Sequence, residues 1–134
     1  MHLQLKQEWE LGAPIDGGGF GTVYEATSVD GVVAAVKLIP KAPGAQRELL
    51  FVDLSDVRNV IPIIDEGETE DRWVLVMPGA EKSLRKHLDN TPGPLSIADA
   101  VPILTDIAES LVDLNGRVVH RDLKPQNILR YNGH

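Results

Sequence analysis

The chain has 134 residues, of which 43% are hydrophobic and 25% are charged, so it can bury the core of one ordinary domain and is not disordered. Thirteen Lys and Arg against twenty Asp and Glu leave a formal net charge of −7, which disfavours nucleic acid as a partner. The absence of cysteine excludes disulfides and thiolate zinc sites. The sequence contains neither a membrane-spanning apolar run nor a signal-peptide pattern, so we expect a cytoplasmic location.

The first half of the chain carries the alternation and the apolar runs that are typical of β-strands. Five strands are predicted, over residues 9–17, 22–27, 32–39, 60–64 and 73–77. Asp30-Gly31, between the second and third of these, is typical of a tight hairpin turn. The acidic run 65–71, between the last two, is interpreted as a solvated hairpin tip without a function of its own.

Helical patterns interrupt and follow these strands. Short helices are predicted over residues 45–54 and 83–88. The strongest helical pattern spans residues 96–114 and begins with a capping-box pattern at Ser96 and Asp99. Its apolar residues recur at helical spacing on one side: Ile97, Val101, Leu104, Ala108 and Leu111. Strands followed by helices predict an α+β fold.

Four glycines gather at the end of the first predicted strand and before the second, at positions 17, 18, 19 and 21. Because glycine has no Cβ, such a loop lets backbone N–H groups approach a phosphate closely. An ordinary hairpin also uses glycines in this way. The cluster by itself therefore indicates a nucleotide only weakly.

Lys37 stands on an otherwise apolar predicted strand, where burial of a lone ammonium group is unfavourable. One interpretation is a side chain that extends from the strand end into water. The other is a cation held for anionic phosphates, with Glu48 near the start of the short helix as its carboxylate partner. Glu48 has an alternative of its own, since a carboxylate in the first turn also stabilises the helix dipole.

Residues 119–129 read Val-His-Arg-Asp-Leu-Lys-Pro-Gln-Asn-Ile-Leu and carry the most specific pattern in the chain. A carboxylate at Asp122, an ammonium group at Lys124 and an amide oxygen at Asn127 can converge if the backbone forms a tight loop. Together they could accept a hydroxyl proton, neutralise a phosphate and ligate Mg²⁺. A chance match over so many positions is very improbable.

With these motifs the chain resembles the eukaryotic-type (Hanks-type) serine/threonine protein kinase family along nearly all of its length. Lys124 followed by Pro125 favours the serine/threonine branch over the tyrosine branch. The resemblance implies a kinase N-lobe of five antiparallel strands and one helix over residues 1–78. The hinge, the first helices and the catalytic loop of a C-lobe are expected over residues 79–134. It also implies ATP and Mg²⁺ as cofactors and a protein serine or threonine hydroxyl as substrate.

The resemblance assigns roles residue by residue. Asp122 corresponds to the catalytic base, Lys124 to the phosphate-neutralising lysine and Asn127 to a Mg²⁺ ligand. Lys37 corresponds to the lysine that binds the α- and β-phosphates, and Glu48 to its partner. The residues expected to contact the nucleotide are Ile15, Asp16, Gly17, Gly18, Gly19, Phe20, Gly21, Thr22, Val23, Ala35, Lys37, Met77, Pro78, Ala80 and Leu129.

Three features depart from the family pattern. Asp16 stands where the first loop glycine is usual, and its carboxylate is expected to weaken nucleotide binding. Only eleven residues separate Lys37 from Glu48, so the helix is expected to lose an early turn. The sequence stops at His134, before an Asp-Phe-Gly motif. We therefore expect the 134-residue chain to be inactive by itself, and the helix at 96–114 to remain exposed for self-association.

Three functions remain open at this point. The first is the N-terminal half of an active serine/threonine protein kinase, favoured by the intact charged residues of the motifs. The second is a naturally short kinase-like binding module that regulates a partner without phosphoryl transfer, favoured by Asp16 and by the missing segment. The third is a small-molecule phosphotransferase, which Arg121 beside His120 and the Lys124-Pro125 pair disfavour.

Overall fold

The computed structural model describes residues 2–18, 21–41, 56–79, 82–117, 123–131 and 134. The chain forms two compact units, the first made of Met1–Asp53 and Ile61–Gly79, and the second of Leu54–Val60 and Ala80–His134. Residues 54–60 thus belong to the second unit, whereas the division expected from the sequence places them with the first. The predicted helix over 45–54 lies outside the described residues.

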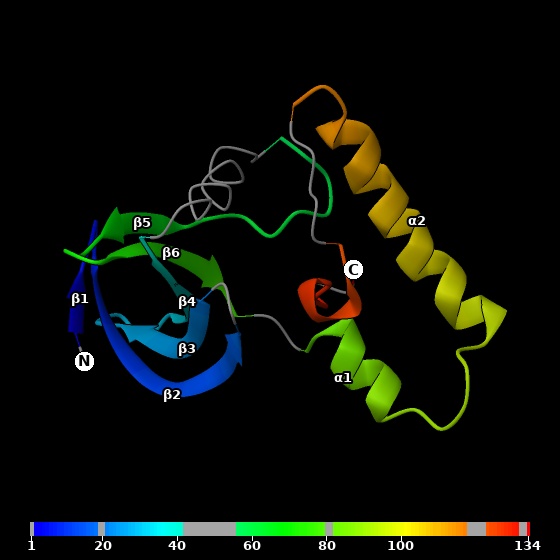
Figure 1. Cartoon of the computed structure of the whole chain (residues 1–134), viewed down its shortest axis with the longest axis horizontal. Coiled ribbons are helices and arrows are strands. Elements are labelled where there is room, and N and C mark those ends of the chain that lie inside the picture. Colours follow the sequence, from blue (N-terminus) through cyan, green and yellow to red (C-terminus); the bar gives the residue numbers. More distant parts are fainter. Residues whose placement is uncertain (1, 19–20, 42–55, 80–81, 118–122, 132–133) are drawn as a thin grey trace. The chain divides into compact units, whose positions relative to one another are not determined.

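Within the described residues, the strands of the first unit form one antiparallel sheet in the order β1-β2-β3-β4-β6-β5 (Figure 1). The strands are β1 (His2–Gln4), β2 (Glu8–Gly18), β3 (Gly21–Ser28), β4 (Val33–Pro40), β5 (Asp65–Glu68) and β6 (Arg72–Pro78). The described residues therefore form six strands where the sequence predicts five, because β1 and β5 were not predicted and the strand predicted over residues 60–64 does not form. The predicted α+β fold is confirmed.

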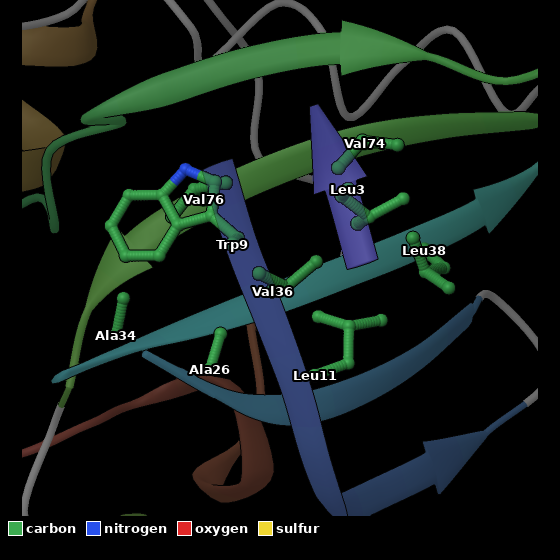
Figure 2. Close-up of a cluster of buried hydrophobic side chains, with 9 residues drawn as sticks. All are labelled: Leu3, Trp9, Leu11, Ala26, Ala34, Val36, Leu38, Val74 and Val76. Atoms are coloured by element: carbon green, nitrogen blue, oxygen red, sulfur yellow. The ribbon is translucent and has the colours of Figure 1, made fainter. Parts of the chain in front are cut away.

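The main hydrophobic cluster of the first unit lies on one face of this sheet, and Ile39 and Leu75 are buried on the other face. Trp9 of β2, Val36 of β4 and Val76 of β6 are completely buried. Since side chains alternate between the two faces of a strand, Ala34 and Leu38 join Val36 on the core face of β4. Figure 2 shows the nine core residues, which are Leu3, Trp9, Leu11, Ala26, Ala34, Val36, Leu38, Val74 and Val76.

The hairpin turn predicted at Asp30-Gly31 joins β3 to β4 and is confirmed. Gly31 has a φ of +84°, in the left-handed region that favours glycine. Ser28 stabilises the turn through its backbone and its side chain. Its N–H donates to the carbonyl of Val32 (3.0 Å), and its hydroxyl accepts from the N–H of Val32 (3.0 Å).

The strand predicted over residues 60–64 is wrong, because these residues form no strand and β5 begins at Asp65. Pro62 has no N–H to donate to a neighbouring strand. The N–H of Ile64 donates to the carbonyl of Val76 (2.8 Å) and leads the chain into β5. The acidic run is therefore only partly a hairpin tip, since its first four residues pair with β6.

Asp65 is a buried carboxylate, with 2% of its surface exposed. It accepts hydrogen bonds from Nε1 of Trp9 (2.9 Å) and from the N–H groups of Lys6 (3.2 Å), Gln7 (3.2 Å) and Glu66 (2.9 Å). Burial by itself would raise the pKa of Asp65, but these hydrogen bonds to the ionised form lower it below its usual value. The Asp65 carboxylate therefore connects the turn between β1 and β2 to β5. In the strand order, β1 and β5 are the two edge strands.

The described part of the second unit contains helices and a short 3₁₀ turn (Figure 1). Its described helices are α1 (Leu84–Asp89), α2 (Ile97–Leu114) and the 3₁₀ helix η2 (Pro125–Asn127). The hydroxyls of Ser83 and Ser96 cap α1 and α2, each accepting from the N–H three residues later at 3.2 Å. The cap predicted at Ser96 is confirmed, and so is the predicted end of α2 at Asn115.

Two neighbouring residues, Arg58 and Asn59, bind the polar side of α2. The guanidinium group of Arg58 contacts Asp113 through Nε (2.9 Å) and Nη2 (3.0 Å), and Glu109 through Nη1 (2.9 Å). Nδ2 of Asn59 donates to the carbonyl of Asp106 (3.0 Å). The hydrogen bonds from Arg58 lower the pKa of Asp113 to about 2. These contacts explain why residues 54–60 belong to the same unit as α2.

Candidate functional site

The sheet face opposite to the core carries four of the predicted nucleotide contacts. On β4, Ala35 and Lys37 alternate with buried residues and are partly exposed. The strand register places Val23 of β3 opposite Lys37, and Met77 of β6 opposite Ala35. Because directly paired residues share one face of a sheet, these four side chains lie on a common, partly exposed surface. We call it the Lys37 face.

The glycine-rich turn joins β2 to β3, and Gly18 pairs with Gly21 at its base. Gly21 has a φ of +142°, and a Cβ at this position would lie 2.6 Å from the carbonyl oxygen of Leu38 on β4. The fold itself therefore requires glycine at position 21, apart from any phosphate. The two residues at the tip, Gly19 and Phe20, lie outside the described residues.

Replacing Gly21 by alanine should lower the free energy of unfolding by about 2–4 kcal/mol, because the new side chain combines an unfavourable φ with a backbone clash. Gly31 is the matched control, since its φ of +84° is also positive but nothing lies within 4 Å of its Cβ position. Gly31→Ala should lose about 1 kcal/mol. Urea denaturation of both variants measures the difference, and equal losses would contradict a tight contact with Leu38.

The other residues of β2 and β3 that are predicted to contact the nucleotide lie on the same hairpin. Asp16 pairs with Val23, and Gly17 pairs with Thr22. The register shifts between Pro14 and Asp16, and Ile15 at this irregularity is 57% exposed. An exposed apolar side chain beside the glycine turn is compatible with an adenine contact, which stays a prediction.

The predicted hinge begins where β6 ends. Pro78 is the last residue of β6 and pairs with Ala34, so the register places it on the face opposite to Met77. Ala80 and Glu48 lie outside the described residues. The pairing of Lys37 with Glu48, and the nucleotide contact of Ala80, therefore stay predictions.

The segment predicted to be the catalytic loop is a tight turn where the structure describes it. Lys124 immediately precedes η2. The carbonyl of Lys124 accepts a hydrogen bond from the N–H of Asn127 (2.9 Å). Both side chains are exposed. Beyond the turn, Leu129 forms an isolated β-bridge with Ser83, the residue that caps α1. Asp122 lies outside the described residues, so its convergence with Lys124 and Asn127 stays a prediction.

The described residues contain no cluster of three or more His, Cys, Asp or Glu side chains that could hold a metal ion. The predicted Mg²⁺ ligand, Asn127, is an exposed residue with an amide oxygen, and oxygen is the donor that Mg²⁺ prefers. One oxygen fits the chemistry of a Mg²⁺ ligand but does not make a site by itself. Nucleotide phosphates normally supply further oxygens in kinase sites.

Sequence reasoning missed two polar networks, the Asp65 hydrogen bonds and the contacts of Arg58 with α2. Asp65 sits in an acidic run that looks solvated, and nothing in its neighbourhood in the sequence signals burial. The contacts of Arg58 with α2 could have been anticipated from the sequence of the helix. Glu109 and Asp113 are four residues apart on a helix and so share one face, which is a suitable partner for an arginine.

Residues 9–134 match the sequence model of the protein kinase domain, described as "Protein kinase domain". The chain belongs to the protein kinase domain family. The match covers every predicted site residue and begins at Trp9, so β1 precedes it. The kinase family assignment agrees with the Lys37 face and with the tight turn at Lys124.

Several serine/threonine-protein kinases are similar to this chain. It is 35% identical over 137 residues to serine/threonine-protein kinase pkn2 of Myxococcus xanthus, covering 94% of the chain and 16% of that protein. It is 37% identical over 122 residues to the serine/threonine-protein kinase PknH of Mycobacterium tuberculosis, and this match covers 84% of the chain and 20% of PknH. It is 31% identical over 137 residues to the serine/threonine-protein kinase PrkC of Bacillus subtilis, and this match covers 94% of the chain and 21% of PrkC. The chain thus spans about a fifth or less of the length of these relatives.

Among the helices that the structure describes, none is both long and apolar enough to cross a membrane.

Proposed function

We propose that the protein carrying this chain is a serine/threonine protein kinase that transfers the γ-phosphoryl group of ATP to a protein hydroxyl. The observation that carries this proposal is the Lys37 face, where one cation stands among Val23, Ala35 and Met77 beside a glycine turn. Such a surface suits a ligand with an apolar base and anionic phosphates. The Lys124-Pro125 pair and the names of the relatives support the serine/threonine class.

In this proposal each charged residue has one task. The ammonium group of Lys37 binds the α- and β-phosphates and fixes their position. As the substrate hydroxyl oxygen bonds to the γ-phosphorus, the bond to the β–γ bridging oxygen breaks and ADP leaves. The carboxylate of Asp122 accepts the hydroxyl proton, and Lys124 stabilises the charge on the transferred group. Positioning and charge stabilisation supply most of the rate.

The proposed cofactors are ATP and Mg²⁺. Asn127 would hold the metal through its amide oxygen, next to the phosphates. When bound, Mg²⁺ neutralises the charge of the phosphates. Asp16, at the position usual for the first loop glycine, adds a carboxylate near the same phosphates and is expected to weaken nucleotide binding.

The test is transfer of labelled γ-phosphate by the purified complete protein to peptides that carry serine, threonine or tyrosine as the single hydroxyl. We expect label on serine and threonine peptides and none on the tyrosine peptide. Transfer to small-molecule acceptors alone would contradict the protein-kinase assignment. Nucleotide binding without any transfer would instead support the second candidate, a kinase-like binding module that Asp16 favours.

The proposed partners are a protein substrate and, by self-association through the helix at 96–114, a second copy of the chain. We do not propose nucleic acid as a partner, since the net charge of −7 opposes it. The proposed location is the cytoplasm, where ATP is available.

A further inference from the structure

Two segments of the second unit that are far apart in the sequence lie side by side. The N–H of Leu84 donates to the carbonyl of Ile128 (2.7 Å), and the N–H of Arg130 donates to the carbonyl of Lys82 (2.9 Å). An isolated β-bridge connects the same two segments. The start of α1 is therefore fixed beside the segment that follows η2, and Lys124 immediately precedes η2.

These two segments carry the opposite charge from the chain as a whole. Residues 82–90 and 123–131 contain five cations and one carboxylate, whereas the whole chain has thirteen Lys and Arg against twenty Asp and Glu. Outside the described residues, Glu81 adds a carboxylate beside the first segment, and Arg121 adds a cation before the second. We call the five cations the α1 basic cluster, which consists of Lys82, Arg85, Lys86, Lys124 and Arg130.

Lys82 and Lys86 are the members of the cluster whose charge is available to a ligand. Lys86 is exposed and Lys82 is half-buried. Neither side chain forms an ion pair with a residue that the structure describes, whereas Arg85 is paired with Asp89 of the same helix (2.6 Å). A surface of one sign attracts ligands of the other sign and raises their concentration near it. The ligand that suits this surface is therefore anionic.

The position of the cluster relates it to the acceptor of the phosphoryl group. In the proposed function, on which this inference rests, the hydroxyl of a protein substrate reaches Asp122 and Lys124. An extended peptide covers about 3.3 Å per residue, so residues three or four positions from that hydroxyl lie about 10–13 Å from it. The α1 basic cluster begins at Lys124 and continues through the backbone pairing to α1. Residues that flank the acceptor hydroxyl therefore come within reach of these cations.

We propose that the α1 basic cluster selects protein substrates with acidic side chains close to the acceptor serine or threonine. Carboxylates of the substrate neutralise Lys82 and Lys86, and basic side chains at the same positions are repelled. The chain as a whole is acidic and does not favour such substrates, so the preference has to come from this cluster. A short acidic peptide contacts only the cluster, whereas a long nucleic acid also meets the acidic remainder of the chain.

The test measures phosphorylation by the complete protein of peptides that share one threonine and differ only in its flanks. Three glutamates before the threonine, or three after it, are compared with glutamine and with lysine at the same positions. One of the glutamate peptides should have a kcat/KM at least about tenfold above that of its glutamine counterpart, because several exposed charge pairs each contribute a few-fold. The preference should appear in KM and decrease between about 0.05 M and about 0.5 M salt, which screens exposed charges.

Variants of Lys86 locate the source of the preference. Lys86→Glu should lower kcat/KM for the preferred glutamate peptide about fivefold and leave kcat/KM for the glutamine peptide unchanged. Lys86→Arg keeps the charge and should keep the preference. Lys6→Glu is the matched control, because Lys6 is also exposed but lies between β1 and β2 in the first unit. It changes the net charge by the same amount and should leave the preference intact.

The outcomes separate this specificity from the proposed kinase function. Equal kcat/KM for the glutamate and glutamine peptides would overturn the specificity and leave the kinase function intact. A preference that Lys86→Glu and Lys6→Glu reduce equally would also overturn it, since the source would then be the net charge of the protein. Transfer to none of the peptides would overturn the proposed function and, with it, the specificity.

Discussion

Replacing Asp122 by alanine should reduce phosphoryl transfer by the complete protein at least about 100-fold, which is the loss typical of one electrostatic contact in a transition state. The Asp122 carboxylate is proposed to accept the hydroxyl proton, and the neighbouring Lys124 cannot accept it. Lys37→Ala should cause a loss of the same order, because it removes the cation that positions the phosphates on the Lys37 face. Single-turnover kinetics measures both effects.

The two variants should differ in which step they impair. Lys37→Ala should weaken nucleotide binding as well as transfer, whereas Asp122→Ala should bind nucleotide normally and fail in the chemical step. Lys41→Ala is the control for Lys37, since Lys41 lies beside the same sheet but contacts Glu68 (2.5 Å) and the ring of Trp73. Near-normal turnover by Asp122→Ala would contradict its assignment as the base.

The position of the Lys37 face could be predicted from the sequence because local patterns determine it. Alternation along β4 separates Lys37 from the core residues, and the Asp30-Gly31 turn sets the register with β3. Together these place Val23 opposite Lys37 without any knowledge of the rest of the chain. The same holds for the caps of α2, where Ser96 is a local signal.

The features that the sequence did not predict correctly depend on contacts between residues that are far apart in the sequence. The strand predicted at 60–64 rests on apolar composition, yet pairing with β6 begins at Asp65. The burial of Asp65 depends on donors at Lys6, Gln7 and Trp9, which are 56 to 59 positions away in the sequence. A pattern of neighbouring residues contains no information about such donors.

The α2 helix combines both situations. Its bounds were predictable from the caps, but the apolar side that periodicity identifies is the exposed one in the described structure. The buried residue is Leu114, at the end of the helix. Periodicity shows that a helix has an apolar side; it does not say what covers that side.

Replacing Asp65 by alanine should lower the free energy of unfolding by about 3–5 kcal/mol, because it leaves one buried and two part-buried donors without an acceptor, at about 1–3 kcal/mol for a buried one. The indole N–H of Trp9 and the N–H groups of Lys6 and Gln7 lose their partner together. Glu66→Ala is the matched control, since Glu66 is the exposed neighbour on the same strand. It should change stability by less than about 0.5 kcal/mol. Urea denaturation measures both.

Asp65→Asn separates the charge from the shape of this side chain and makes the effect depend on pH. The amide keeps one acceptor oxygen, so the loss should be smaller, about 1.5–3 kcal/mol for the charged hydrogen bonds. The pKa of Asp65 is lower in the folded chain than in the unfolded chain. Its ionised form therefore stabilises the fold above the unfolded pKa of about 3.9, and this contribution disappears as the pH falls through the folded pKa. The stability difference between the native chain and Asp65→Asn should be constant near neutral pH and shrink below about pH 4. A difference that stays the same down to the acid limit would contradict the role of the charge, because an amide does not titrate there.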